Sequence, residues 1–189
     1  MILAAGGASR YGSLKQIALL NGVPLVRRAA LAAANSGLDP IIVVAGSNHE
    51  RVEHALGGLE GVAIAMNENW QSGQASSLRV GLDAATMAHS DGALVMLSDQ
   101  PLIGGSALER ILSEFKAGHR IVASAFSRTI GAPAVFGSEF FDDLRKLDGD
   151  SGAGKWLRER LSLVRSVQLP EAAIDIDTAS DMEAILERD

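Results

Sequence analysis

The sequence predicts an α/β fold in three layers, with a mostly parallel, Rossmann-like sheet of mixed character flanked by helices. Short, continuous apolar runs, typical of strands buried on both faces, alternate along the chain with stretches of helical period. This alternation favours parallel strands joined by helical crossovers. A length of 189 residues favours one domain.

Strands are expected where a short apolar run ends in a polar or glycine-rich turn. In chain order these runs are Met1–Ala5, Ile41–Ala45, Val62–Met66, Ala93–Leu97 and Ile121–Ala125. Helices are expected between them, at Leu25–Asn35, Glu50–Leu56, Ser76–Ala88 and Ser106–Lys116. The glycines that follow three of these stretches, typical of helix C-termini, are Gly37, Gly57 and Gly118.

The pattern changes after Ala125. Further strands are expected at Ala134–Phe136, Val164–Leu169 and Ile174–Ile176. Helices are expected at Glu139–Leu147 and Ala153–Arg160, with a last helix at the C-terminus. The change indicates a C-terminal portion that adds strands of mixed direction rather than another strand–helix repeat.

Composition excludes several kinds of protein. The absence of cysteine excludes disulfides, thiolate metal sites and a cysteine nucleophile, and it fits a cytoplasmic location. A net charge of −6 argues against nucleic acid as a partner, because that affinity depends on basic clusters. No apolar run reaches the roughly 18 residues that cross a bilayer, and no signal-peptide pattern is present, so no membrane partner is expected. Met1–Ala5 is short for a buried strand, which leaves open whether the native chain begins upstream.

The segment from Leu3 to Lys15 is the most informative part of the chain. An apolar start runs into a loop with glycines at 6, 7 and 12 and two cations, Arg10 and Lys15. Glycine lets backbone N–H groups approach a ligand closely, and the cations add charge for phosphate oxygens. The loop therefore predicts a phosphate site. The alternative is an ordinary strand-to-helix turn with two solvated cations.

Two well-known phosphate loops do not match this segment. In the P-loop, Lys directly follows the second glycine, whereas Ser13 and Leu14 separate Gly12 from Lys15. The spacing of the three glycines also differs from the Gly-x-Gly-x-x-Gly dinucleotide fingerprint. The loop is therefore a nucleotide loop of a third kind, or none.

Acidic residues at the ends of predicted strands are candidate metal ligands. Asp99 directly follows the strand expected at Ala93–Leu97, at the sheet edge where α/β proteins bind ligands. Asp175 and Asp177 alternate with apolar residues and would point to one face of a strand. Carboxylates with substrate phosphates are the usual ligands of Mg²⁺. Alternatively, Asp99 caps a turn before Pro101, and Asp177 or Thr178 caps the last helix.

A polar block at Gln74, Ser76 and Ser77 opens the helix expected at Ser76–Ala88. These side chains offer hydrogen-bond donors and acceptors at a helix N-terminus, where base edges can be read and negative charge is favoured. Capping by Ser76 or Ser77 is the alternative, and the preceding Trp70 is equally suited to a core position.

Together these motifs resemble the MobA-like NTP transferases, a nucleotidyltransferase family with the nucleotide-diphospho-sugar transferase fold. The loop is similar to the family signature Leu-Ala-Ala-Gly-x-Ser-x-Arg-x-Gly-x-x-Lys, except for Ala8 where the family usually has Ser. Asp99-Gln100-Pro101 resembles the molybdenum cofactor cytidylyltransferase branch. The Asp175–Asp181 segment and Gly149–Ala153 also match, whereas Gly131-Ala132-Pro133 lacks the family's His.

The resemblance implies a role for each matching residue. Nucleotide binding falls to Leu3, Ala4, Ala5, Gly6, Gly7, Arg10, Gly12, Lys15, Gln74, Ser76 and Ser77. The residues implied in catalysis are Lys15, Arg10 and Asp99. Those implied in Mg²⁺ binding are Asp99, Asp177 and Asp175. The acceptor side would include Gln100, Pro101, Gly131, Pro133 and Asp150. Residues 1–189 then form one NTP-transferase domain, with the nucleotide part at about 1–125 and the acceptor part at about 126–189.

The function implied is Mg²⁺-dependent transfer of CMP from CTP to a phosphate-bearing acceptor, molybdopterin, with release of pyrophosphate. A transient contact with a molybdoenzyme maturation partner is implied as well. Two enzymatic alternatives share this chemistry, a sugar-phosphate nucleotidyltransferase and a molybdopterin guanylyltransferase. A nucleotide-binding module without catalysis is the alternative of another class.

Overall fold

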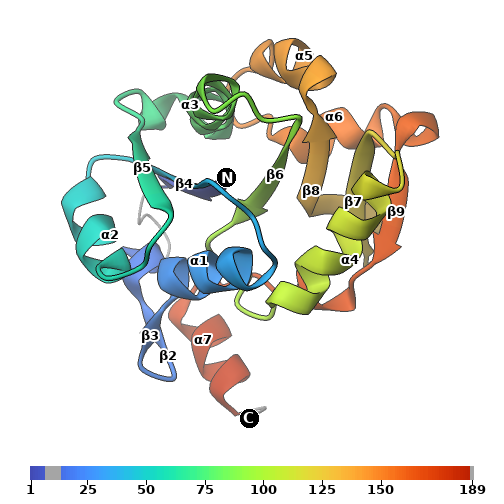
Figure 1. Ribbon diagram of the computed structural model, residues 1–189. Helices are drawn as coiled ribbons and strands as arrows, with labels where there is room; N and C mark the ends of the chain where they lie inside the picture. Colours follow the sequence, from blue (N-terminus) through green and yellow to red (C-terminus); the bar gives the residue numbers. More distant parts are fainter. Residues whose placement is uncertain (7–13, 188–189) are drawn as a thin grey trace.

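The computed structural model describes residues 1–6 and 14–187. Its centre is a seven-stranded sheet with the order β5-β4-β1-β6-β8-β7-β9 (Figure 1). The strands are β1 (Ile2–Ala4), β4 (Ile41–Ala45), β5 (Val62–Met66), β6 (Gly92–Leu97), β7 (Ile121–Phe126), β8 (Thr129–Gly137) and β9 (Arg165–Gln168). The predicted α/β class is confirmed.

Strand direction divides the sheet in the way the sequence predicts. Strands β5, β4, β1 and β6 run parallel to one another. Strand β8 is antiparallel to both β6 and β7, and β9 runs parallel to β7. The parallel half thus ends in a mixed C-terminal half. The carboxyl ends of β1 and β6 meet at one edge, since Leu3 lies opposite Leu97.

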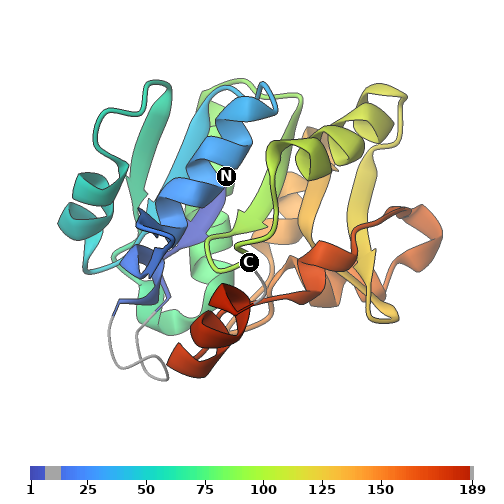
Figure 2. The same ribbon diagram turned by 90° about the horizontal axis from the view of Figure 1, so that it is seen from below.

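Helices cover both faces of the sheet. One face carries α1 (Leu25–Asn35), α2 (His49–Leu56) and α4 (Gly105–Lys116). The other face carries α3 (Gln74–Met87), α5 (Phe141–Arg145) and α6 (Ala153–Arg158). Figure 2 shows α1 and α4 side by side across the first face. The result is the three-layer arrangement expected from the strand–helix alternation.

The apolar runs explain why both faces are buried. Along β4, Ile41, Val43 and Ala45 join the core under α1, α2 and α4. Ile42 and Val44 join the core under α3, α5 and α6. Because successive side chains point to opposite faces, a continuous apolar run supplies both cores.

A third, smaller core joins the two ends of the chain. The hairpin of β2 (Leu19–Leu20) and β3 (Val23–Pro24) lies beside α7 (Ala179–Leu186) in Figure 1. The buried residues of this cluster are Leu20, Leu25, Ile176, Met182 and Ile185. This contact brings the segment before α7 next to the segment that follows the glycine-rich loop.

Several boundaries differ from those expected. The strand predicted at Ile174–Ile176 is wrong: the segment is extended but joins no ladder, and Ile176 N–H donates instead to the Asp99 carbonyl at 2.9 Å. The helix predicted at Glu139–Leu147 is a 3₁₀ turn (Ser138–Phe140) followed by the short α5. The β2–β3 hairpin was not predicted. Among the described residues, no helix is long and apolar enough to cross a membrane.

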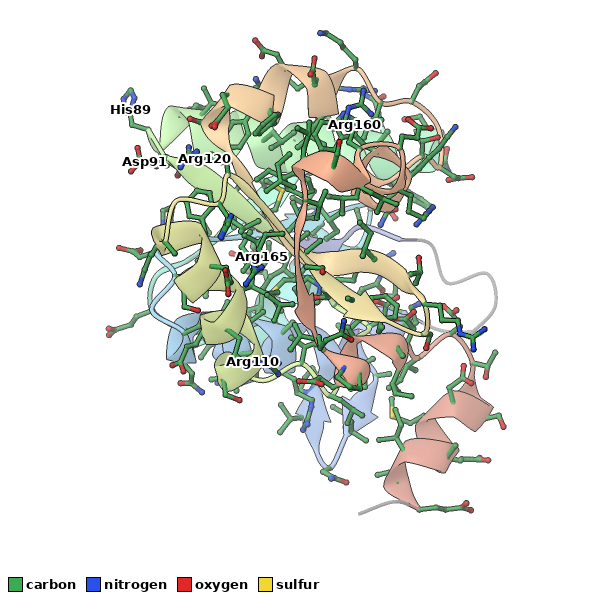
Figure 3. All side chains as sticks on the ribbon, turned by 90° about the vertical axis from the view of Figure 1, so that its right-hand side faces the viewer. His89, Asp91, Arg110, Arg120, Arg160 and Arg165 are labelled. Carbon is green, nitrogen blue, oxygen red and sulfur yellow. The ribbon has the colours of Figure 1, made fainter. Side chains whose placement is uncertain are left out.

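Arginines mark the β9 edge of the sheet (Figure 3). Arg165 Nε lies 3.0 Å from a Glu114 carboxylate oxygen, and Arg120 Nε lies 2.8 Å from one of Glu139. Arg165 belongs to the edge strand β9, where a charged side chain discourages pairing with other chains, whereas Arg120 directly precedes β7.

Candidate active site

A pocket of about 580 Å³ opens beyond the carboxyl ends of β1 and β6. This is the edge where open α/β sheets bind ligands. The residues that line the pocket are Leu3, Ala5, Gly6, Lys15, Gln16, Trp70, Gln71, Gly73, Gln74, Ser77, Leu97, Ser98, Asp99 and Asp150. The loop ends, the polar block and the first predicted metal ligand therefore surround one cavity.

Lys15 joins two of the predicted acids. Its Nζ lies 2.6 Å from Asp99 Oδ2 and 2.8 Å from Asp177 Oδ1. The side chains of Lys15 and Asp99 are 19% and 21% exposed, whereas that of Asp177 is 53% exposed. Three segments far apart in the sequence thus meet through one ammonium group at the pocket.

The backbone around this cluster is held by local interactions. Ile176 is fully buried between its two acidic neighbours, and its bond to the Asp99 carbonyl ties the C-terminal segment to the end of β6. Thr178 caps α7: its Oγ1 accepts from Asp181 N–H at 3.2 Å, and Asp181 accepts from Thr178 N–H at 2.7 Å. This capping box confirms that Thr178, not Asp177, caps the last helix, which leaves Asp177 free to face Lys15.

Electrostatics favour charged Lys15 and disfavour a fully ionised acid cluster. Burial alone would lower the pKa of Lys15, but the charges and hydrogen bonds of Asp99 and Asp177 outweigh it and raise the pKa. Partial burial, followed by the negative charges of Asp99 and Asp177, raises the pKa of Asp175 to about 6. The cluster carries more negative charge than Lys15 alone balances.

The polar block after β5 is organised by a buried asparagine. Asn67 Nδ2 donates to Ser76 Oγ at 2.8 Å and to Ser77 Oγ at 2.9 Å. The Ser76 hydroxyl lies 2.8 Å from the Gly73 carbonyl oxygen and is enclosed within the protein. Ser77 and Gln74 line the pocket, and the Ser77 hydroxyl can still donate its own hydrogen there. Of the three predicted residues, Ser76 is buried behind the pocket lining, where it contacts the backbone of the polar block.

Two glycines allow the block to meet the loop that carries Asp150. Gly73 has a φ of +102°, and a Cβ there would run into the carbonyl group of Gly149. Ala75 N–H donates to that same carbonyl at 3.1 Å. A Cβ at Gly152 would collide with the amide of Gln74. This close approach places Asp150, predicted on the acceptor side, in the wall of the pocket.

The described ends of the glycine-rich loop are tied together. Gln16 Nε2 donates to the Gly6 carbonyl at 2.5 Å. Leu3, Ala5 and Gly6 line the pocket, whereas Ala4 packs into the core beneath α1. The predicted residues Gly7, Arg10 and Gly12 lie outside the described residues.

The structure does not bring the remaining acceptor-side residues to the pocket wall. Gln100 is buried, and its Nε2 donates to the carbonyls of Ala132 at 3.2 Å and Ala172 at 3.0 Å. Pro101 is buried next to Gln100, and Gly131 and Pro133 are buried within β8. These buried residues are part of the protein interior next to Asp99 rather than of the pocket lining.

Comparison with known proteins follows from this geometry. The model of the MobA-like NTP transferase domain matches residues 1–165. The chain belongs to this family of nucleotidyltransferases.

Individual members of the fold resemble the chain over nearly its whole length. The purine catabolism protein PucB of Bacillus subtilis (strain 168) is 26% identical over 201 residues, covering 98% of this chain and 94% of PucB. The structure of Rv0371c from Mycobacterium tuberculosis H37Rv has a TM-score of 0.81 and 28% identity, covering 98% of this chain and 95% of Rv0371c. The nucleotidyl transferase Mth528 from Methanothermobacter thermautotroptrophicus has a TM-score of 0.81 and 26% identity, covering 99% of this chain and 94% of Mth528. Rv0371c is also known in a complex with manganese, which matches with a TM-score of 0.77, 26% identity and the same coverage.

The acids of this MobA-like site have the chemistry of a divalent metal site that is completed by a ligand. Asp99 Oδ1 is buried and has no hydrogen-bond partner among the described residues. Within residues 1–6 and 14–187, no three Asp, Glu, His or Cys side chains are grouped so as to hold a metal ion. A metal at Asp99 and Asp177 would need more oxygens, which substrate phosphates supply at Mg²⁺ sites. The donors present therefore fit a metal that binds together with a phosphate-bearing ligand.

Trp70 and Gln16 are among the pocket residues that sequence reasoning did not assign. Trp70 lies against Gly46, where a Cβ would stand 2.9 Å from the indole Cγ. Gln16 is buried and closes the loop ends. A signal existed for Trp70, since it lies between the polar residues of a turn rather than in an apolar run. No sequence signal marked Gln16.

Proposed function

We propose that this MobA-like nucleotidyltransferase transfers CMP from CTP to a phosphate-bearing acceptor, and that the acceptor is molybdopterin. The observation that carries the proposal is the cluster of Lys15, Asp99 and Asp177 at a pocket that is also lined by neutral hydrogen-bonding groups. The cationic and acidic groups suit phosphates and their metal, while the amides and hydroxyls suit a base and ribose.

The reaction needs no covalent enzyme intermediate. A phosphate oxygen of the acceptor attacks the α-phosphorus of CTP, and the bond to the β-phosphate oxygen breaks to release pyrophosphate. Negative charge develops on the oxygens of the transferred and leaving groups. Lys15, held as an ammonium beside the pocket, supplies positive charge at that point, and Arg10 is proposed to do the same.

Asp99 and Asp177 are the residues proposed to hold Mg²⁺, with Asp175 close by. When bound, the metal supplies neutralisation of phosphate charge and helps align the attacking and leaving oxygens. The buried Oδ1 of Asp99, which has no partner within residues 1–6 and 14–187, supports this role, because a buried carboxylate oxygen is costly without a donor or cation.

The neutral lining residues Gln74 and Ser77 support a pyrimidine nucleotide. Gln74 offers an amide and Ser77 a hydroxyl at the N-terminal end of α3. Both can complement the amino and carbonyl edge of cytosine without bringing a charge. Gly73 and the Asp150 loop lie beside Gln74, and Asp150 is placed on the side proposed for the acceptor.

A substrate matrix tests the proposal. Pyrophosphate release is measured for CTP, GTP, ATP and UTP, each with molybdopterin or with a phosphosugar, in the presence of Mg²⁺. We expect turnover with CTP and molybdopterin to exceed every other pair. Preferred turnover with GTP would indicate a guanylyltransferase, and turnover with a phosphosugar would replace molybdopterin as the acceptor. Binding of nucleotides with no turnover for any pair would contradict transferase activity.

A further inference from the structure

The two carboxylates proposed for the metal are already engaged by a cation of the protein itself. Lys15 Nζ lies 2.6 Å from Asp99 and 2.8 Å from Asp177, which are distances of direct ammonium–carboxylate hydrogen bonds. One oxygen of each acid is thereby occupied. A divalent ion that bound Asp99 Oδ2 and Asp177 Oδ1 would have to take the place of the ammonium group.

The lysine leaves this pair of acids incompletely balanced. Two carboxylates carry a charge of −2, whereas one ammonium carries +1. Asp99 Oδ1 is enclosed and has no partner in the described part of the chain. A divalent cation matches the pair better in charge and accepts more oxygen ligands. The acids therefore retain an affinity for a metal that Lys15 only partly satisfies.

A phosphate group bound in the same pocket is an alternative partner for the Lys15 ammonium group. Its side chain lines the pocket together with Gly6 and Ser98, so a phosphate group in the pocket would lie within reach of its flexible four-carbon stem. Polyphosphate offers an ammonium group several oxygens in exchange for two carboxylates. Movement of the side chain alone would free both acids, without any change in the backbone.

We propose that Lys15 is an internal counter-cation that occupies the metal position until a triphosphate draws it away, so that metal and nucleotide load together. This inference rests on the proposed function and adds an order of events to it. The apparent metal affinity is reduced by the fraction of molecules in which Lys15 holds the acids. Coupling of this kind is reciprocal, so bound metal frees Lys15 for phosphate by the same factor. The negative charge of the two acids stays partly compensated while the site is empty, and metal binding in the absence of substrate is disfavoured.

Metal binding without nucleotide tests the proposal directly. Free Mn²⁺ is measured by electron paramagnetic resonance during titration of the wild type, Lys15→Met and the control Lys116→Met, whose lysine is exposed on α4. Methionine keeps the length of the stem and removes the charge. We expect Lys15→Met to bind Mn²⁺ at least about tenfold more tightly than the wild type, and Lys116→Met to match the wild type. Equal or weaker binding by Lys15→Met would overturn the proposal.

A double variant locates the metal that Lys15→Met binds. Adding Asp99→Asn to Lys15→Met should abolish the gain in Mn²⁺ affinity, because one of the two acids is then neutral. A gain that survives Asp99→Asn would place the Mn²⁺ elsewhere and overturn the proposal.

Chemical labelling of the wild type tests the same competition even where Lys15→Met fails to fold. Reductive methylation is followed by mass spectrometry, with Lys116 as the internal reference. We expect Lys15 to react slowly in the free protein and faster, relative to Lys116, as Mn²⁺ saturates the site. Saturation with no change in Lys15 reactivity would show that metal and lysine bind the acids side by side. The substrate matrix is measured separately, so CMP transfer by a wild type that fails these tests would refute the loading order and leave the proposed function standing.

Discussion

Lys15→Ala should destabilise the metal-free protein, because it removes the only described cation that joins Asp99 and Asp177. Exposed ion pairs contribute about 0–1 kcal/mol, whereas breaking a fully buried pair costs roughly 3–5 kcal/mol. The side chains of Lys15 and Asp99 are about four-fifths buried and that of Asp177 is half exposed, so an intermediate loss of about 2 kcal/mol is expected. For a chain of this size that corresponds to a fall of roughly 4–8 °C in the melting temperature.

Urea unfolding in EDTA measures this loss, with Lys116→Ala as the matched control. The control should change the unfolding free energy by no more than about 0.5 kcal/mol. A double-mutant cycle of Lys15→Ala with Asp99→Ala should give a coupling of at least about 1 kcal/mol, since removing Asp99 relieves the charge that Lys15→Ala leaves unpaired. A loss below about 0.5 kcal/mol with no coupling would refute the reasoning.

Three further predictions concern the frame around the site. Gly73→Ala should weaken nucleotide binding at least tenfold in calorimetry, because the new methyl group collides with the Gly149 carbonyl; unchanged affinity would show that this contact is dispensable. Thr178→Ala should lower the unfolding free energy by about 1 kcal/mol through loss of the cap, while Thr178→Ser should recover most of it; an alanine variant as stable as the wild type would count against the capping box. In the folded protein the pKa of Asp175 is raised from 3.8 to about 6. The protonated Asp175 carboxyl therefore contributes stability that is present below about pH 4 and is lost as the pH rises through 6. Asp175→Asn should consequently gain stability relative to the wild type between about pH 4 and pH 7.5 in EDTA. A difference that is constant with pH would contradict the raised pKa.

Local pattern was sufficient to predict most of the regular elements. The strands at Ile41–Ala45 and Val62–Met66 and the helix at Leu25–Asn35 begin and end at the expected residues. The burial of Ile41–Ala45 and Leu25–Asn35 also agrees with their apolar patterns. The expectation that Val62–Met66 is buried on both faces is wrong, because this strand is at the edge of the sheet and none of its residues is fully buried. The β2–β3 hairpin also had a local signal, since Asn21-Gly22 between apolar residues is typical of a tight turn with two positive φ angles, and the structure has φ values of +52° and +76° there.

The errors arose where tertiary contacts override local pattern. Ile174–Ile176 alternates like a strand but joins no ladder of the described sheet, and Ile176 instead donates a backbone hydrogen bond to Asp99 after the end of β6. Ser76 stays a predicted nucleotide-binding residue, and its contact with the buried Asn67, which donates to its hydroxyl, is a second tertiary contact of this kind. Neither outcome is visible in the residue types alone.

The residue types of the candidate site could be read from the sequence, but its internal pairing could not. Lys15 was expected to serve phosphate, and Asp99 and Asp177 to serve metal. The structure joins all three across separations of 84 and 162 residues. Spacing motifs identify which groups meet a ligand. They do not reveal which groups neutralise one another before the ligand arrives.

The most direct test of the central claim is the rate of pyrophosphate release by Asp99→Asn, with CTP, molybdopterin and Mg²⁺, compared with the wild type. Asparagine keeps the shape of the side chain and removes the charge proposed to hold the metal. The proposed site predicts a fall in turnover of at least about 100-fold, the size seen when one group that stabilises a transition state is removed, in a protein whose circular dichroism is unchanged. Turnover at the wild-type rate by a folded Asp99→Asn protein would contradict the assignment of this pocket as the active site.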